Sequence, residues 1–213
     1  MRVLGTLVVL GLAVTAFGVA PAAAQESGMT WAGSLYGGYA KIMENDDLLP
    51  VPGGSFGGRG NVFAMLDPVL GIGAELGYYS FGSEDYEIPT IERGELNFSA
   101  FQATAQAIAR GARGSVRPFG TLGLGLYSLK GSKKGVELDA GNVPIPGSDF
   151  DDSETDSKFG VNLGGGVQFK PSASSISFGL EARWHTIFNG WINEDLEESA
   201  LDVLTVMAGI NFN

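Results

Sequence analysis

The chain has 213 residues, of which 33 are glycine, none is cysteine and only 17% are charged, with a net charge of -11 and a sequence pI near 4.4. Without cysteine there is no disulfide framework, no thiolate metal site and no lipoprotein acylation site. The acidic balance argues against nucleic-acid binding, which requires a basic face.

The first residues predict export. Arg2 precedes an apolar and glycine-rich run over residues 3–20, and Ala22-Ala23-Ala24 has the small-residue pattern of a cleavage site. We therefore expect residues 1–24 to be a cleaved signal peptide. Retention as a membrane anchor is the alternative, because the run approaches spanning length. Residues 25–213 are expected to form one domain, in which no further stretch reaches the roughly 18 apolar residues of a spanning helix.

Period-two alternation of apolar with polar or small residues predicts eight strands. The clearest runs from Val69 to Phe81, where even positions such as Leu70 and Ile72 are apolar and odd positions include glycines and Glu75. The other segments are 31–40, 57–66, 101–109, 121–127, 158–169, 178–185 and 204–212. No face is assigned to segment 31–40, because both of its parities carry aromatic residues and glycine.

Short and long breaks alternate between these segments. The short ones are 67–68, 111–115 and 170–175, and the long ones are 41–55, 82–95, 130–156 and 189–199. Most carboxylates lie in the long breaks, whereas Arg110, Arg113, Arg117 and Lys170 gather at the short ones. Short periplasmic turns, long external loops and an even strand number are typical of membrane barrels.

Aromatic residues lie where strands meet breaks, as expected of interfacial girdles. They are Tyr78, Tyr79 and Phe81 at one end, and Phe119, Phe169 and Phe212 at the other. Hydrocarbon offers the backbone no hydrogen-bond partner, so a sheet in a membrane must close on itself. The sequence therefore predicts an all-β fold, an eight-stranded antiparallel up-and-down transmembrane β-barrel with short periplasmic turns and long extracellular loops.

Inward parity identifies candidate lumenal residues. A turn centred on Asp67 would place Arg59 opposite Glu75, and we expect these two to form an ion pair. A four-residue turn over 171–174 would place Asn162 opposite Arg183 and Gly164 opposite Glu181. The predicted lumenal polar network contains Arg59, Glu75, Asn162, Glu181, Arg183 and the sole histidine, His185.

Three stretches carry a family resemblance: RPFGTLGLG at 117–125, KFGVNLGGGV at 158–167 and GLEAR at 179–183. In this order they resemble the outer-membrane protein β-barrel domain family, the OmpA-like and opacity-protein-like barrels, over the whole mature chain. The resemblance implies an integral protein of the cell outer membrane, surrounded by lipid and lipopolysaccharide. It also implies that Phe212 is an assembly signal read by the barrel-assembly machinery, although Asn213 follows where the family ends in an aromatic residue.

Other chemistries are weaker. His185 shares a face with Glu181 and Arg183, as a carboxylate-oriented base would, but Thr186 and Ile187 follow it, so the His-x-Ser of a lipid A deacylase is absent. The acidic run 149–156 lacks the glycine and distal glutamate of a calcium-binding EF-hand. We therefore assign no catalytic residue, metal or cofactor.

For a barrel with acidic outer loops and no catalytic residues, we expect a structural and surface-interaction role without catalysis, in envelope integrity, adhesion or host contact. A host or surface ligand would meet the acidic loops, whose generic composition does not specify it. Because many inward positions are glycine, a narrow pore or a small-ligand transport barrel is the alternative, ahead of a lipid A-modifying enzyme.

Overall fold

The computed structural model describes residues 29–43, 55–171, 174–188 and 200–212. The predicted signal peptide and residue 213 lie outside these ranges, as do most of the long breaks 41–55 and 189–199. Within the described ranges no helix is long and apolar enough to cross a membrane.

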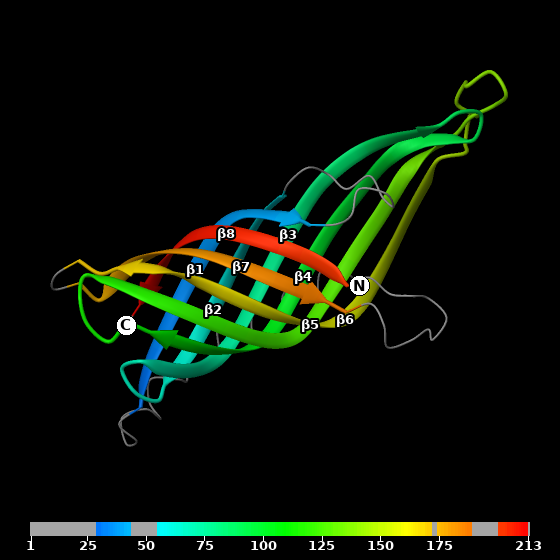
Figure 1. Ribbon diagram of the computed structural model, residues 1–213. Coiled ribbons are helices and arrows are strands. Elements are labelled where there is room, and N and C mark those ends of the chain that lie inside the picture. The colour runs from blue at the N-terminus through cyan, green and yellow to red at the C-terminus, as the bar shows by residue number, and fades with distance from the viewer. Residues whose placement is uncertain (1–28, 44–54, 172–173, 189–199, 213) are drawn as a thin grey trace.

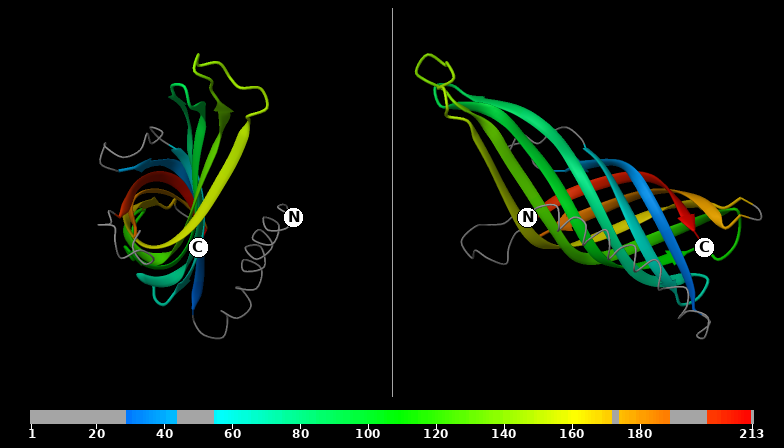
Figure 2. Two further views of the ribbon diagram at one scale, coloured as in Figure 1. Left: turned by 90° about the vertical axis from the view of Figure 1, so that its right-hand side faces the viewer. Right: turned by 180° about the vertical axis from the view of Figure 1, so that it is seen from behind.

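The described residues form eight antiparallel strands, each hydrogen-bonded to the next, with β8 returning to β1 (Figures 1 and 2). The predicted closed barrel is thus confirmed. The strands are β1 (Thr30–Ile42), β2 (Ser55–Met65), β3 (Leu70–Ile88), β4 (Glu92–Arg110), β5 (Val116–Glu137), β6 (Phe150–Phe169), β7 (Ile176–Ile187) and β8 (Leu201–Phe212).

Alternation along each strand separates a lumenal face from an outer face. In β3, Glu75 and Tyr79 are buried, whereas Ile72 and Tyr78 are more than half exposed. In β1, whose faces the sequence left open, Tyr36 is buried and Leu35 is 51% exposed. Successive side chains point to opposite sides of a strand, so each strand presents one apolar row to lipid and one polar or small row to the lumen.

The first short hairpin has the expected parity but a different centre. Arg59 lies opposite Gly77, and Glu75 lies opposite Asn61. The Leu66 N–H donates to the Leu70 carbonyl at 2.9 Å, so the turn is centred on residue 68. The predicted centre at Asp67 was wrong. Asp67 instead begins the turn, and its carboxylate accepts hydrogen bonds from the N–H groups of Val69 and Leu70, 2.6 and 2.7 Å away.

The β6–β7 register also differs from the expected one. Asn162 lies opposite His185 rather than Arg183, and Gly164 lies opposite Arg183 rather than Glu181. Each partner is two residues further along β7 than predicted. Because the difference is even, every side chain keeps its predicted face.

Two of the predicted long loops are largely strand. β3 to β6 continue beyond the barrel as a four-stranded sheet, the projecting sheet, which rises from the rim in Figures 1 and 2. The ladder between β3 and β4 shifts between Ser80 and Ser83, and Gly82 there has φ of 78°. At the tip, the Thr90 N–H donates to Asn142 Oδ1 at 2.7 Å, which ties the two hairpins together.

Three residues assigned to the aromatic girdles lie inside the barrel instead. Tyr79, Phe81 and Phe119 are at most 7% exposed, whereas Phe169 and Phe212 are each 42% exposed on the outside. All three lie on the inward parity of their strands, so their ring faces the lumen even though they stand near strand ends.

Candidate functional site

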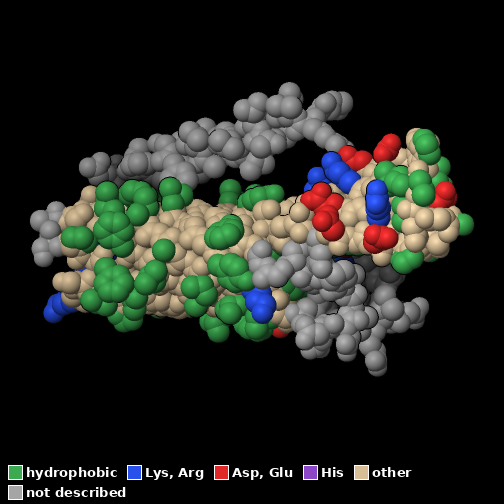
Figure 3. Space-filling model, turned by 90° about the horizontal axis from the view of Figure 1, so that it is seen from above, with side chains coloured by type: hydrophobic (Ala, Val, Ile, Leu, Met, Phe, Trp, Pro, Cys, Tyr) green, Lys and Arg blue, Asp and Glu red, His purple; other side chains and the backbone are tan. Residues whose placement is uncertain are grey.

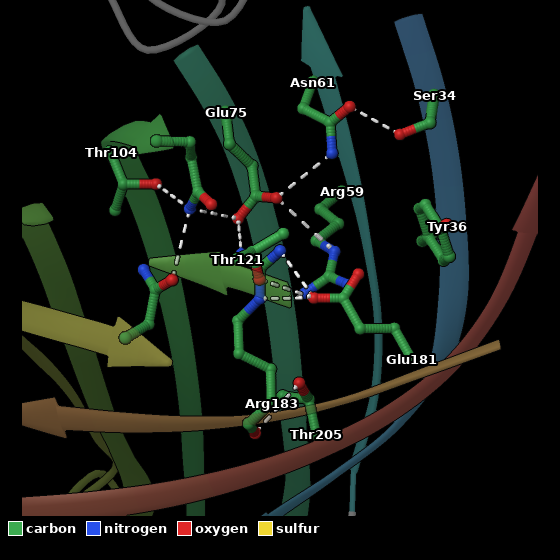
Figure 4. A network of polar contacts seen from close by, with 12 residues as sticks. Ser34, Tyr36, Arg59, Asn61, Glu75, Thr104, Thr121, Glu181, Arg183 and Thr205 are labelled. Atoms are coloured by element: carbon green, nitrogen blue, oxygen red, sulfur yellow. Dashed lines mark hydrogen bonds and ion pairs between the residues drawn. The ribbon is translucent and has the colours of Figure 1, made fainter. Parts of the chain in front are cut away.

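Four buried charges occupy the middle of the lumen. Arg183 Nη1 lies 2.6 Å from Glu75 Oε1, and Arg183 Nη2 lies 2.7 Å from Glu181 Oε1. Arg59 Nη2 lies 2.5 Å from Glu181 Oε2, and Arg59 Nε lies 3.5 Å from Glu75 Oε2 (Figure 4). None of the four is more than 4% exposed. Buried charges are tolerated when paired, and here two cations face two anions.

Neutral side chains complete the shell around the two carboxylates. Glu75 accepts hydrogen bonds from Gln102 Nε2 at 2.7 Å, Gln106 Nε2 at 3.3 Å and Asn61 Nδ2 at 3.4 Å. Thr121 donates to Glu181 at 3.2 Å. These four residues were not among the predicted lumenal residues. Their signal was the inward parity of a polar side chain, the same criterion that selected Glu75.

A second chain of contacts leads from this charged network to His185. Gln106 Nε2 donates to Asn162 Oδ1 at 3.2 Å, and Asn162 Nδ2 donates to the Tyr127 hydroxyl at 3.1 Å. The Tyr127 hydroxyl lies 3.1 Å from His185 Nδ1, and Thr205 Oγ1 lies 3.4 Å from His185 Nε2. Both ring nitrogens therefore face hydroxyl groups, and neither faces a carboxylate.

Apolar clusters close the lumen on both sides of this network. We call the barrel end with the three short connections the turn end, and the other the loop end. The cluster toward the loop end contains Tyr36, Ala40, Tyr79, Phe81, Ala100, Tyr127, Ile187, Val203 and Met207. The cluster toward the turn end contains Phe63, Met65, Ile108 and Phe119. A cavity of about 20 Å³ lies beside the turn-end cluster, which is room for about one water molecule.

Neighbouring side chains occupy the space beside the inward-facing glycines. A Cβ on Gly164 would lie 2.6 Å from Glu181 Oε1 and 2.7 Å from Thr121 Oγ1. A Cβ on Gly123 would lie 2.5 Å from Gln106 Nε2 and 2.8 Å from Asn162. These glycines therefore make room for the long side chains of the network.

The projecting sheet carries charged side chains on both faces, and aromatic rings on the face that continues the lumen. On the face that continues the lumen, Lys133 lies over the rings of Tyr86 and Phe150, 5.2 and 5.3 Å from their centroids. Its Nζ is 2.5 Å from Glu92 Oε1, and this hydrogen bond raises the pKa of Lys133. On the other face, Lys134 pairs with Asp151 at 3.2 Å.

The acidic run 149–156 alternates between these two faces, because most of it belongs to β6. Its carboxylates consequently do not converge on one point. Among the described residues, no group of three or more histidine or carboxylate side chains is placed to hold a metal ion. Figure 3 shows acidic and basic side chains gathered at this end, and hydrophobic side chains over the barrel wall.

With the closed barrel and its filled lumen established, the family follows from comparison. The model of the outer membrane protein beta-barrel domain matches residues 9–212. The chain belongs to this family. It is accordingly an integral protein of the outer membrane, and its short turns face the periplasm.

One solved structure shows the same fold, and two others are similar to the chain at lower TM-scores. Neisserial surface protein A is 17% identical with a TM-score of 0.54, over 87% of this chain and 99% of that one. Ail of Yersinia pestis, in complex with the heparin analogue sucrose octasulfate, is 16% identical with a TM-score of 0.49, over 85% and 99%. The outer membrane enzyme PagL is 14% identical with a TM-score of 0.39, over 86% and 99%. No curated protein matches the chain.

Proposed function

We propose that this barrel is a non-catalytic membrane anchor that presents the projecting sheet for contact at the cell surface, in adhesion, host contact or envelope integrity. The observation that supports it is the continuous pairing of β3 to β6 beyond the barrel, up to Glu92 opposite Glu137 and Gly135 opposite Phe150. A hydrogen-bonded sheet holds its surface side chains in fixed positions, which a loop of the same composition does not.

A second support is the absence of an accessible reaction centre in the described lumen. His185 is 2% exposed and makes T-shaped contacts with the Tyr79 and Tyr127 rings, whose centroids are 6.0 and 5.9 Å away. Thr205 is 1% exposed, and its hydroxyl already contacts the Arg183 carbonyl. A lipid substrate would have to displace the loop-end cluster to reach either group.

The filled lumen equally favours a closed barrel over a pore. Eight strands enclose an interior that side chains normally fill. Here the charged network and both apolar clusters occupy it. We propose that the barrel forms no large ohmic channel in a planar bilayer.

The proposal includes the biogenesis expected from the sequence: cleavage after Ala24 and recognition of the last strand through Phe212. The Phe212 side chain points outward, and its backbone pairs with Gly33 and Ile176. The ring therefore stays on the outer surface, and the backbone edge of β8 is open to an assembly factor until β1 pairs with it.

A trimmed barrel tests the contact role. The two hairpins are cut at directly paired residues, between Ser83 and Asn97 and between Ser132 and Ser153, and each is rejoined by an Asn-Gly turn. Heat-dependent electrophoretic migration checks that the trimmed barrel folds. Cells displaying it are then compared with wild-type cells for attachment to cultured epithelial monolayers and for sensitivity to a bulky antibiotic.

We expect the trimmed barrel to fold, and attachment to fall to the level of cells without the protein. Unchanged attachment together with unchanged antibiotic sensitivity would contradict the contact role of the projecting sheet. Lys134→Gln is the matched control, because it removes one exposed ion pair and leaves the sheet in place.

A further inference from the structure

The outer surface of β3 to β6 changes chemistry in three steps along the strands. The lipid-facing belt ends at Tyr78, Phe101, Leu126 and Phe159. The acidic zone of the projecting sheet begins at Asp85, Glu95 and Asp151, which lie in one hydrogen-bonded row with Lys134. Between them lie the outward positions of residues 80–83, 97–99, 128–132 and 153–157, which we call the collar.

The collar contains no carboxylate. Its outward side chains are serine, threonine or asparagine, apart from Lys130. Lys130 is paired with Ser99 on one side and Thr155 on the other, and the next row places Ser132 between Asn97 and Ser153. Directly opposite side chains have Cβ atoms about 5 Å apart, so a hydroxyl side chain flanks Lys130 on the strand at either side.

Lys130 differs from the other lysines of β5 and β6 in having no acidic partner. Lys133 pairs with Glu92, Lys134 with Asp151 and Lys158 with Asp156. Among the described residues no carboxylate lies within ion-pair distance of Lys130, whose side chain is exposed. An exposed lysine without a carboxylate partner in a strongly acidic chain is suited to bind an anionic group of another molecule.

We propose that the collar binds the phosphorylated sugar headgroup of the outer-leaflet glycolipid, with Lys130 facing a phosphate. The collar continues the lipid-facing surface directly, so it lies at the level of the headgroups of the lipids that cover the belt. Phosphates there would repel carboxylates and attract a lysine, and sugar hydroxyls would pair with serine, threonine and asparagine.

The dimensions agree with such a headgroup. From Ser128 to Ser132 the collar rises about 13 Å at 3.3 Å per residue, and four strands at about 4.8 Å spacing make it about 14 Å wide. The outer surface of β7 and β8 differs from the collar because it carries a carboxylate. Asp202 in β8 faces outward there and accepts a hydrogen bond from Thr186 at 2.7 Å. The proposed site is thus confined to β3 to β6.

The test measures lipid binding to the full barrel refolded in detergent micelles. Native mass spectrometry follows the complexes formed with bisphosphorylated lipid A, with enzymatically dephosphorylated lipid A and with phosphatidylglycerol. The variants are Lys130→Gln, Ser99→Glu and the control Lys134→Gln. The control makes the same charge change on the same face of β5, two residues beyond Ser132 and so outside the collar. Heat-dependent migration confirms that each variant is folded.

We expect Lys130→Gln to weaken bisphosphorylated lipid A binding about fivefold, the effect of about one lysine at a charged lipid surface. Ser99→Glu should weaken it at least as much, and Lys134→Gln should leave it unchanged. Equal effects of Lys130→Gln and Lys134→Gln, equal affinity for dephosphorylated lipid A, or equal affinity for phosphatidylglycerol would each overturn the proposal. Since no surface partner takes part, the outcome is independent of the contact role proposed above.

Discussion

Arg183 Nη1 lies 2.6 Å from Glu75 Oε1, although the two residues stand 108 positions apart in the chain. They come from β7 and β3, on opposite sides of the lumen, and Glu181 and Arg59 complete the group from β7 and β2. The barrel wall is a single layer of strands without a shared apolar core at its middle. Charge pairing across the lumen therefore holds opposite walls together there.

Removing one arginine should lower the free energy of unfolding more than removing an arginine and a glutamate together. Arg183→Met leaves Glu75 and Glu181 with Arg59 as their only arginine partner, and we expect it to lower the free energy of unfolding by about 3–5 kcal/mol. Urea unfolding in lipid vesicles measures this. The double variant Arg183→Met/Glu181→Gln restores neutrality and should recover part of the loss. A double variant less stable than the single one would show that net charge is not what matters.

Gly164→Ala should disturb the same network from the backbone. Its Cβ would stand 2.6 Å from Glu181 Oε1, and that carboxylate is held by both arginines. We expect a destabilisation of about 1–3 kcal/mol, as for overpacked interiors, measured by the same urea unfolding. Gly165→Ala is the control, because Gly165 faces outward and the nearest atom to its added Cβ is 3.6 Å away. Equal effects of the two substitutions would contradict the packing argument.

The turn at Asp67 should make stability depend on pH in acid. Hydrogen bonds from the N–H groups of Leu70 and Val69 lower the pKa of Asp67. A lowered folded pKa means that the stabilisation is present above the pKa of the unfolded chain and is lost as pH falls through the folded pKa. Wild type should therefore exceed Asp67→Asn in unfolding free energy near neutral pH, and the difference should close as the pH falls through the lowered pKa of Asp67. Because all other carboxylates are common to both proteins, a difference that persists in acid would contradict this assignment.

Gly82 should be required where the β3–β4 ladder shifts. Its φ of 78° lies in the left-handed region, which costs other residues about 1–2 kcal/mol. Gly82→Ala should accelerate amide exchange over residues 83–88 and leave the barrel strands unchanged, as hydrogen exchange would show. Faster exchange throughout β3 would place the effect in the barrel instead. Gly147 also has a positive φ, 81°, but it stands in a tip loop outside the strands, so Gly147→Ala is a control for strain alone.

Several features followed from sequence because lipid and lumen impose opposite chemistry on the two faces of a strand. Period-two alternation was enough to predict strand number, closure and the inward face of Arg59, Glu75, Glu181 and Arg183. It also placed His185 and Asn162 inside, where the structure has them. The polar neighbours Gln102, Gln106 and Thr121 also lie on inward-facing positions, but nothing in their spacing indicated that they would meet Glu75 or Glu181.

Tertiary structure alone decided the register, the membership of the network and the length of the strands beyond the membrane. Register depends on which backbone groups pair in a turn, and moving the centre from residue 67 to residue 68 changes every cross-strand partner by two positions while leaving the hydrophobic pattern unchanged. The network joins side chains from strands far apart in the chain, which no local pattern encodes. Above the membrane both faces of a sheet meet water, and residues 130–137 of β5 and 151–157 of β6 continue there without the alternation that reveals a strand.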